Sequence, residues 1–574
     1  MSYRRNSIDS DSQFSDEERR TKILGVFAGI GNNCNNMVGA GIFSSPGLVL
    51  HKVQSPGIAL ILWLIGGIVA LCGSLSYVEL GSSLSDGGGE TIYLKTAFPR
   101  PRALLSYMFS FTMIVAIRPG AISADANVVA QYFVYMATAK GECENSDELH
   151  PKKYLANYDF WRLRLISLLV VWIITIYHII SNKWANRINQ TLTTIKMTTL
   201  LVISGVGLAA IKRSISESSS TDPSNWKNLF PNVGIGARSL TGGLIPILFA
   251  YNGWNNLNYT LDEFVDPQKK LLVSNTISVG IVTILYLLAN IAYTNVPLTQ
   301  VTGGSDPSEI IAGQFALNVG GLKLARALSF FVCLSAFGAL AAMMWSGSRV
   351  IVAAAKANYI PIFSPWLTKW NSKTDTPINA LIAQSVWCSV IILFCPYDDP
   401  FQFLVVISEY TSWVFFGLSA LGLLVLRKRQ PDLRRPFKVF RIFPILFICF
   451  ALFIIFGSFV NDDETTLDIK LPKVNVTLNN SCGYGNDDGE PSYAYYLPYT
   501  TSLIVIAISA ICWYFLFHIN WRNRLSQGEN EKSNHEDIKN DDRLPLEAAE
   551  TIETIESNNS SQISQTPESA MSKA

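Results

Sequence analysis

The feature that most constrains this chain is a series of long apolar segments, each about the length of a helix that crosses a lipid bilayer. A bilayer core about 30 Å thick needs roughly 20 apolar residues in helical form. About twelve segments meet this condition, so the sequence predicts an all-α polytopic membrane protein. They lie at about 23–48, 57–84, 103–136, 162–180, 188–211, 240–262, 274–297, 327–357, 378–396, 401–426, 441–460 and 497–519.

Composition excludes several classes of protein. Of 574 residues, 49% are hydrophobic and only 16% are charged, whereas soluble domains average about 25% charged residues. Lys and Arg number 45 against 44 Asp and Glu, without the basic excess of a nucleic-acid binder. The nine Cys form no CxxC pair and the five His form no HExxH spacing, so we expect neither a metal nor a cofactor.

Both ends of the chain are polar. Residues 1–20 contain no apolar core, so they do not resemble a cleavable signal peptide. Residues 521–574 are rich in Ser, Asn, Asp and Glu and bury too little apolar surface to fold. We therefore expect two disordered tails around a membrane domain at about 21–520.

Basic residues in the short loops predict the orientation, because cytoplasmic loops are enriched in Lys and Arg. Almost all of them fall on one side if both termini are cytoplasmic, while loop 461–495 on the other side is net acidic. The cytoplasmic set is Arg19, Arg20, Lys22, Lys95, Arg100, Arg102, Lys183, Arg187, Lys269, Lys270, Arg522, Arg524 and the segment 427–441.

The first and sixth segments carry interruptions. Gly39–Gly41 follows a run of asparagines in the first, and Asn252–Asn256 with its glycine falls inside the sixth. Glycine weakens a helix, and polar residues at mid-membrane are tolerated only beside a cavity or another helix. Close-packing glycines would be the alternative explanation, but it leaves the asparagines unexplained.

Broken helices at corresponding positions five helices apart indicate an inverted-repeat transporter with a site near the membrane midplane. The sequence thus predicts a five-plus-five inverted repeat with broken helices 1 and 6. The first repeat covers about 23–211, the second about 240–426, and two further helices lie at about 441–519.

The interruptions also indicate the ligand. A half-helix that begins near Gly41 presents unpaired N–H groups and suits a carboxylate. Half-helices that end before Gly39 and near Phe249–Tyr251 would present free carbonyls, which suit an ammonium group. A site with both ends fits a zwitterion, that is, an amino acid.

Several motifs carry a resemblance to a known family. Val38–Phe43 resembles the glycine-rich element of the amino acid–polyamine–organocation superfamily, and Phe249–Asn255 resembles an element of its L-type amino-acid transporter branch. Residues 77–81, 88–90, 117–119 and 426–431 also match that branch. Asn36, the SSPG run and Asn256–Tyr259 are more similar to fungal methionine permeases. The likeness extends from about residue 20 to 520.

The resemblance implies roles for individual positions. Gly39, Ala40 and Gly41 would hold the substrate carboxylate through backbone amides, and Phe249 would be the aromatic gate. Asn255 would order the unwound sixth helix, while Asn252 departs from the small residue expected there and puts large aromatic substrates in doubt. The remaining expected substrate-binding positions are Val38, Ala250 and Ser412.

Ionisable residues inside spans are candidates for function. The resemblance places Lys196 where sodium-coupled relatives of the fold hold a sodium ion. The alternative is that Lys196 extends to the cytoplasmic face. For Glu79 and Arg349 we expect structural pairing near a membrane face, and for Arg118 we expect contacts with backbone carbonyls freed by a kink at Pro119. Glu409 faces either a cavity or a neighbouring helix.

The expected function is sodium-independent transport of neutral L-amino acids, such as methionine or another large neutral one, by alternating access. Exchange and proton-coupled uptake both remain open, as does the membrane, with the plasma membrane favoured. The alternative is a nutrient receptor that binds amino acids without transporting them. The scattered histidines argue against an enzyme.

Two cysteines and two sequons fall in loops expected outside the cell. The sequons begin at Asn475 and Asn479. In the resembled branch a cysteine in the loop that holds Cys143 binds a heavy glycoprotein subunit, but this chain also has Cys482 in a long loop. An internal Cys143–Cys482 bond, a bond to a heavy subunit and free thiols therefore stay open, with the internal bond favoured.

Overall fold

The computed structural model describes residues 25–85, 87–138, 160–216, 225–231, 236–297, 311–395, 400–459 and 496–519. Within these ranges the chain is predominantly helical, and its one isolated β-bridge joins Asn371 to Thr376. It divides into two units, Met1–Ala510 and Ile511–Ala574. The second is described only by the end of α19 and the π-helix η5 (Tyr514–Ile519).

Eight helical stretches in the described residues are long and apolar enough to cross a membrane. They are formed by α4 (Pro56–Ser83), α6 (Leu104–Thr112) with η1 (Met113–Ile117) and α7 (Arg118–Thr138), α9 (Phe160–Ile180), α10 (Asn182–Ser216), α12 (Pro267–Tyr293), α14 (Ile311–Lys356), α17 (Pro400–Arg429) and α19 (Leu497–Trp513). The shorter apolar helices are α11 (Ala237–Tyr251), α16 (Ile378–Phe394) and α18 (Ile442–Gly457). The predicted all-helical polytopic class is confirmed.

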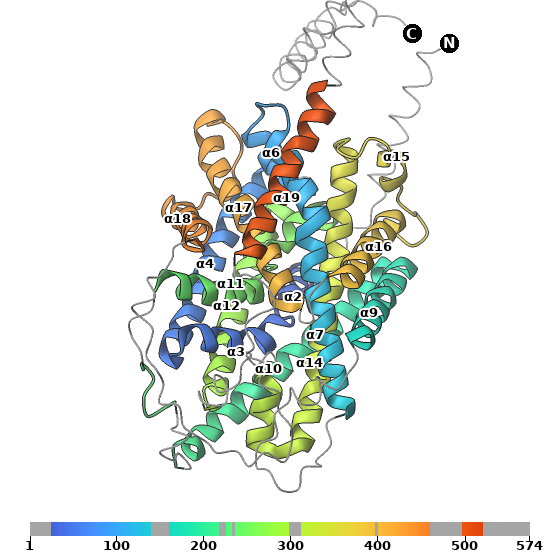
Figure 1. Ribbon diagram of the computed structural model, residues 1–574. Helices are drawn as coiled ribbons and strands as arrows, with labels where there is room; N and C mark the ends of the chain where they lie inside the picture. Colours follow the sequence, from blue (N-terminus) through green and yellow to red (C-terminus); the bar gives the residue numbers. More distant parts are fainter. Residues whose placement is uncertain are drawn as a thin grey trace, which may run out of the picture. The chain divides into compact units, whose positions relative to one another are not determined.

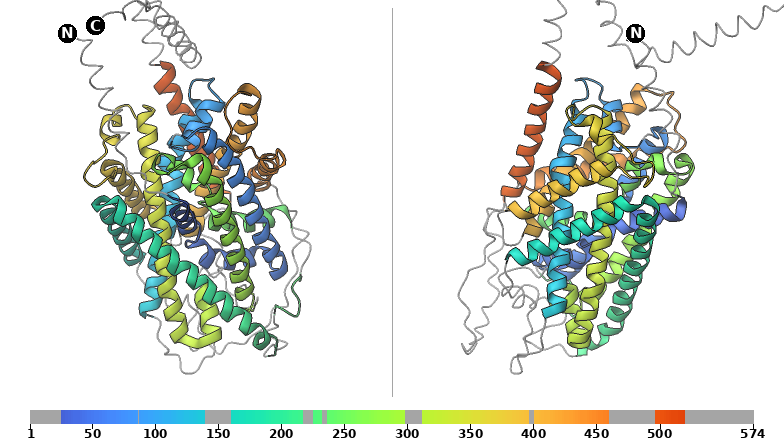
Figure 2. Two further views of the ribbon diagram at one scale, coloured as in Figure 1. Left: turned by 180° about the vertical axis from the view of Figure 1, so that it is seen from behind. Right: turned by 90° about the vertical axis from the view of Figure 1, so that its right-hand side faces the viewer.

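The remaining helices include two that together replace the predicted first span. These are α2 (Val26–Met37) and α3 (Gly41–Val53), and the short α5 (Glu90–Ala97) and α15 (Ser364–Leu367) complete the set. Figures 1 and 2 show α2 and α3 inside the bundle, where α2 packs against α10, α12 and α14 and α3 packs against α11. The interrupted helix thus lies at the centre of the first unit.

Neighbouring helices explain why asparagines are tolerated in α2. The side-chain amide of Asn33 donates to Asn275 Oδ1 on α12 at 2.8 Å. That of Asn35 donates to the Gly338 carbonyl on α14 at 2.9 Å. Polar groups within a membrane need such internal partners, and here two of the asparagines supply contacts between helices.

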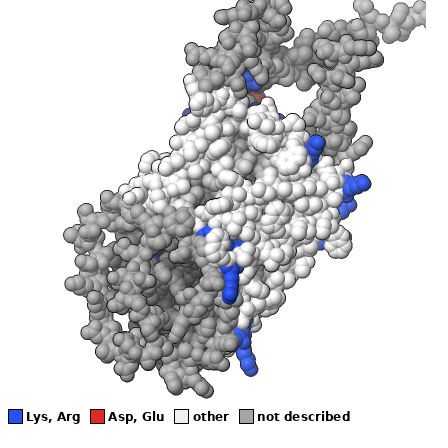
Figure 3. Space-filling model, turned by 45° about the vertical axis from the view of Figure 1, so that its right-hand side comes forward, with Lys and Arg blue, Asp and Glu red and all other residues white. Residues whose placement is uncertain are grey.

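The outer faces of the bundle are apolar. On α9, four exposed residues recur every three or four positions and so lie on one face of the helix: Leu165, Leu169, Ile173 and Ile176. Figure 3 shows one side of the molecule as a broad uncharged surface with scattered Lys and Arg side chains. Such a surface fits a hydrocarbon environment.

Helix α14 begins earlier than the sequence predicts. The apolar pattern indicates a span from about 327, whereas the helical run starts at Ile311. Gly321 adopts φ 68° and ψ −169° and separates a short leading helix from the long one. Glycine takes a positive φ at little cost, so the kink falls where the sequence offers it.

Two buried ion pairs join distant segments, as expected for Glu79 and Arg349. Glu79 on α4 accepts hydrogen bonds from Arg427 and from the Val439 amide at 2.8 Å, and Arg435 lies 3.6 Å away. Arg349 on α14 donates to Glu263 at 2.8 Å. Both pairs are almost fully buried, and removal of one partner from such a pair leaves an unpaired charge.

We predict that Arg427→Met lowers the thermal stability of the protein in detergent. Loss of one partner of a buried pair costs about 3–5 kcal/mol, and the lower end applies because Arg435 stays near Glu79. Lys428→Met is the matched control, because Lys428 is the next residue and is exposed. Equal unfolding midpoints for the two variants would contradict the structural role of the pair.

Candidate functional site

The first helix is interrupted where the sequence predicts it. α2 ends at Met37, Val38 has φ −78° and ψ 80°, and α3 begins at Gly41. The N-cap residue, Ala40, has no polar side chain that could cap α3 with a hydrogen bond. The first amides of a helix have no partner within the helix and attract anions, so this end can receive a carboxylate.

The sixth helix is interrupted in the same way. α11 ends at Tyr251, and the chain then turns through Asn252–Asn255 before the 3₁₀-helix η2 (Asn256–Tyr259). Gly253 has φ +112°, a conformation that side chains rarely adopt. A Cβ there would also lie 2.2 Å from Nδ2 of Asn36 on α2, so both conformation and space require glycine.

The two breaks face each other and form one site. A Cβ on Gly41 would lie only 2.5 Å from the Cα of Ala250, so α3 and α11 touch backbone to backbone. The hydroxyl of Tyr286 on α12 lies 2.6 Å from the Met37 carbonyl and 2.8 Å from the Ala250 carbonyl. Groups about 210 residues apart in the chain therefore meet at one point.

Lys196 on α10 points into the first break and is fully buried. Its ammonium donates to the Asn35 carbonyl at 2.9 Å and to the Val38 carbonyl at 2.5 Å. It therefore does not extend to the membrane surface, which was the alternative. Ser335 also donates to Val38, at 3.2 Å.

The carbonyls at the breaks differ from the sequence-based expectation. The sequence predicts that they are free for an ammonium group, but Val38 already accepts from Lys196, and Phe249 accepts from the Asn252 amide at 3.1 Å. Tyr286 contacts the Met37 and Ala250 carbonyls. These donors of the protein thus occupy carbonyls that the ammonium group of a ligand was expected to contact.

Phe249 lies near the end of α11 and contacts α17. Its ring packs edge-on against Phe401, with centroids 5.8 Å apart and an interplanar angle of 87°. Phe249 is buried. Aromatic pairs of this geometry are worth about 0.5–1.5 kcal/mol beyond their buried area, so the contact holds α11 against α17.

Asn252 and Glu409 form a polar contact between the sixth helix and α17. The side-chain amide of Asn252 donates to Glu409 at 2.5 Å. Arg118 on α7 interacts electrostatically with the same carboxylate and lies 5.3 Å from the centroid of the Tyr259 ring. Glu409 thus faces neighbouring helices, while the Ser412 hydroxyl donates within its own helix to Ser408.

Asn255 ties the unwound segment to α5. Its amide lies 2.9 Å from Glu90 Oε1 and 2.9 Å from the Tyr259 hydroxyl. Tyr77 and Tyr259 also donate to Glu90, each at 3.1 Å. Burial raises the pKa of the Glu90 carboxyl. The sequence motif that holds Glu90 does not by itself predict that this residue anchors Asn255.

Asp125 is a buried acid that sequence reasoning missed. It lies on α7, it is fully buried, and its Oδ2 would be 3.3 Å from a Cβ on Gly39. Its charge interacts with Lys196 and with the Ala40 amide. The signal was available, because Asp125 is an acid inside an apolar span, just as Lys196 is a base inside one.

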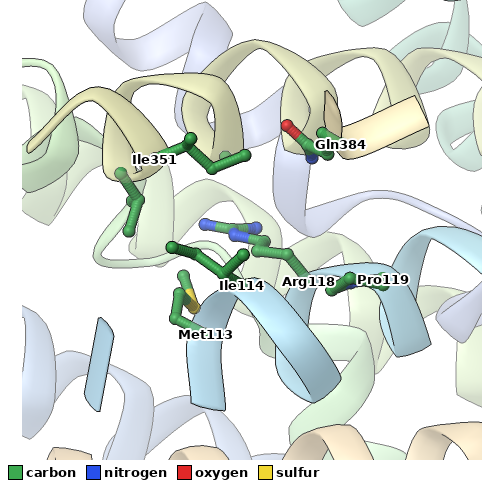
Figure 4. Close-up of a pocket in the computed structure, with 8 residues that line it drawn as sticks. Met113, Ile114, Arg118, Pro119, Ile351 and Gln384 are labelled. Carbon is green, nitrogen blue, oxygen red and sulfur yellow. The ribbon is translucent and has the colours of Figure 1, made fainter. Parts of the chain in front are cut away.

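A small cavity lies elsewhere, between α7, α14 and α16. Its volume is about 10 Å³, room for about one water molecule. Figure 4 shows Arg118 and Gln384 at its edge, with Met113, Ile114 and Ile351 around them. None of its lining residues belongs to either break.

Some predicted features lie outside the described residues. These are Cys143, Cys482, Asn475 and Asn479. The seven cysteines that are described form no disulfide with one another. No group of three or more His, Cys, Asp or Glu among the described residues has the arrangement of a metal site.

Comparison with known proteins agrees with this geometry. Residues 24–478 match the family described as amino acid permease. The chain is 29% identical to the mouse large neutral amino acids transporter small subunit 2 over 76% of each chain. It is 29% identical to the mouse b(0,+)-type amino acid transporter 1, over 80% of this chain and 88% of the relative. It is 27% identical to the human cystine/glutamate transporter, over 77% and 81%.

The interrupted helices and the matches define a multi-pass membrane permease rather than an enzyme. The chain belongs to the amino acid permease family of the amino acid–polyamine–organocation superfamily, with relatives in the L-type transporter branch.

We predict that Gly41→Ala abolishes transport and lowers stability. The new methyl group would overlap the Ala250 backbone, and overpacking of this kind costs about 1–3 kcal/mol. Gly280→Ala in α12 is the control, because nothing lies within 4 Å of its Cβ position and a helical Gly→Ala change stabilises by about 0.5–1 kcal/mol. Uptake and unfolding midpoints measured for both variants test this, and normal uptake by Gly41→Ala would refute the close contact.

Proposed function

We propose that this protein is a sodium-independent transporter of neutral L-amino acids that works by alternating access. The observation that carries the proposal is the meeting of two helix breaks at the N-terminus of α3, whose N-cap residue has no polar side chain. Backbone amides there suit a carboxylate. The names of its relatives, which include a large neutral amino acids transporter subunit and a b(0,+)-type transporter, support amino acids as substrates.

The proposed architecture has twelve spans in a five-plus-five inverted repeat. The breaks fall in the first and sixth spans, at corresponding positions of repeats at about 23–211 and 240–426. Irregular backbone inside a membrane is found where it lines a binding site. The eight long helices, the three shorter ones and the α2–α3 pair are consistent with this number within the described residues.

In the proposed complex the substrate carboxylate lies on the amides of Gly39–Gly41. Val38, Ala250 and Ser412 complete the surroundings, and Phe249 closes over the substrate against Phe401. Asn252, held by Glu409, takes space where a smaller residue would leave room. That favours neutral side chains smaller than large aromatics, of which methionine is the type we propose.

Lys196 is the proposed substitute for a sodium ion. Its ammonium already binds the Asn35 and Val38 carbonyls, which are oxygen ligands of the kind that a cation needs. An ammonium group at this position stabilises the broken helix without an ion from solution.

We further propose a plasma-membrane location with both termini cytoplasmic, disordered tails at 1–20 and 521–574, and glycans at Asn475 and Asn479. Relatives named as transporter small subunits make a heavy glycoprotein partner the alternative. An internal Cys143–Cys482 bond remains the favoured state of those two cysteines, ahead of a partner bond or free thiols.

We predict that replacement of external sodium by choline leaves uptake of L-methionine unchanged. Lys196→Met should abolish uptake, because it removes the cation that holds two carbonyls. Lys212→Met is the control, since Lys212 lies on the same helix and is exposed. Uptake is measured in liposomes for the wild type, for Lys196→Met and for Lys212→Met. Loss of wild-type uptake in choline would disprove the sodium-independent mechanism.

The same liposomes separate a transporter from the rival function, a receptor. A transporter shows counterflow, in which labelled amino acid outside exchanges with unlabelled amino acid inside. A receptor binds the same amino acid without counterflow. Saturable binding with no counterflow would favour the receptor.

We predict that Phe249→Ala slows turnover more than it weakens binding. The aromatic contact with Phe401 is worth about 0.5–1.5 kcal/mol, so its loss should slow turnover roughly two- to tenfold. A gate acts on closure rather than on the bound state. Phe133→Ala, on the exposed face of α7, is the control. Counterflow rates and binding constants are measured for both variants. An unchanged counterflow rate for Phe249→Ala would exclude gating.

A further inference from the structure

Asp125 is fully buried beside the first helix break. Its carboxylate interacts with the Ala40 amide but forms no full hydrogen bond within the described residues. Buried polar groups in native proteins are almost always paired. A buried carboxylate whose described partners, the Ala40 amide and the charge of Lys196, both lie at the first break therefore requires an explanation.

Lys196 is the cation whose charge acts on the Asp125 carboxylate. Lys196 on α10 interacts with it, as does the neutral hydroxyl of Tyr286 on α12. Five titratable groups on α7 and on the helices packed against it have partners elsewhere: Arg118 with Glu409, Arg349 with Glu263, Arg164 with the Leu393 and Cys395 carbonyls, His178 with the Ile174 carbonyl, and Cys333 with the Val129 carbonyl. Cys388 on α16 and Cys34 on α2 are buried thiols.

Lys196 is poorly suited to carry a proton itself. Its ammonium holds two backbone carbonyls, at 2.9 Å and 2.5 Å. Loss of its charge would weaken both bonds at the point where the helix is broken. Asp125 interacts with the Ala40 amide and with the charge of Lys196 but holds no backbone carbonyl, so its protonation leaves the bonds of Lys196 at the break in place.

Asp125 and a substrate carboxylate compete for the same helix end. The Asp125 carboxylate interacts with the Ala40 amide, which is part of the proposed carboxylate site. Two carboxylates that share one site repel, and one of them then binds a proton. Lys196 offers a single positive charge, which balances only one of them.

We propose that Asp125 binds one proton when the substrate carboxylate binds, so that each amino acid is transported with one proton. This rests on the proposed function and selects proton-coupled uptake over exchange. A proton from the outer solution forms an O–H bond on one Asp125 oxygen, while Lys196 keeps its charge and its bonds. After the substrate leaves on the inner side, the O–H bond breaks and the proton passes to water. One positive charge moves with each neutral amino acid.

The test uses the full-length protein in sodium-free liposomes that contain a pH-sensitive dye, with L-methionine and L-leucine as the added substrates. For the wild type, external amino acid should acidify the interior. Uptake should rise as the outer pH falls, by up to about tenfold per pH unit, the limit for linkage to one proton. Counterflow that remains in Asp125→Asn should be accompanied by no acidification and should not depend on pH.

Asp432→Asn is the matched control, since it makes the same acid-to-amide change at an exposed position and should behave as the wild type. Acidification by Asp125→Asn equal to that of the wild type would overturn the proposal and assign the proton to another group. Wild-type counterflow without acidification would also overturn it, while leaving amino-acid transport intact. No wild-type counterflow at all would refute the proposed function instead.

A second variant covers the case in which Asp125→Asn does not fold. Asp125→Glu keeps the carboxyl group but moves it relative to the Ala40 amide and Lys196. Acidification that persists with a shifted pH midpoint supports the role of Asp125. A pH profile identical to that of the wild type contradicts it.

Discussion

The structure depends on how backbone groups are satisfied where two helices break inside the bundle. Unpaired amides and carbonyls are costly away from water, yet both breaks are buried. Lys196 and Tyr286 satisfy the carbonyls from two separate helices, α10 and α12. The start of α3 has no polar side chain at its N-cap, Ala40, and the Asp125 carboxylate interacts with the Ala40 amide. The carbonyls at the breaks are thus satisfied by donors from other helices, while the first amides of α3 attract negative charge.

Glycine positions decide how closely the broken helices approach. Gly41 lets α3 touch the Ala250 backbone, and Gly253 admits the Asn36 side chain. The segments next to the breaks are then fixed from further away, by Asn255 on Glu90 and by Asn252 on Glu409. The buried pairs Glu79–Arg427 and Glu263–Arg349 join other parts of the bundle. Close contact at the centre and polar anchors around it leave little freedom for the site to deform without larger helix movements.

Sequence patterns predicted the helical class, most of the spans and both breaks, because apolar length and misplaced polar residues are local signals. α9 and α17 begin within about two residues of the predicted positions. Sequence patterns could not predict that Lys196 donates hydrogen bonds to the Asn35 and Val38 carbonyls, because that depends on which side of α10 meets α2. Asp125 was missed although its signal was local. Partners such as Glu90 for Asn255 lie 165 residues apart, and only the folded chain brings them together.

The position of the Tyr286 hydroxyl has a consequence for motion. It is within reach of carbonyls on both broken helices, but a hydroxyl has a single hydrogen to donate. At any instant only one of the two helices receives it. If α2 and α11 move apart, the Tyr286 hydroxyl can keep its hydrogen bond to a carbonyl on one of them. It then still donates one hydrogen bond, as it did before the movement. The contact that links the two halves of the site can therefore be released without leaving the hydroxyl hydrogen unbonded.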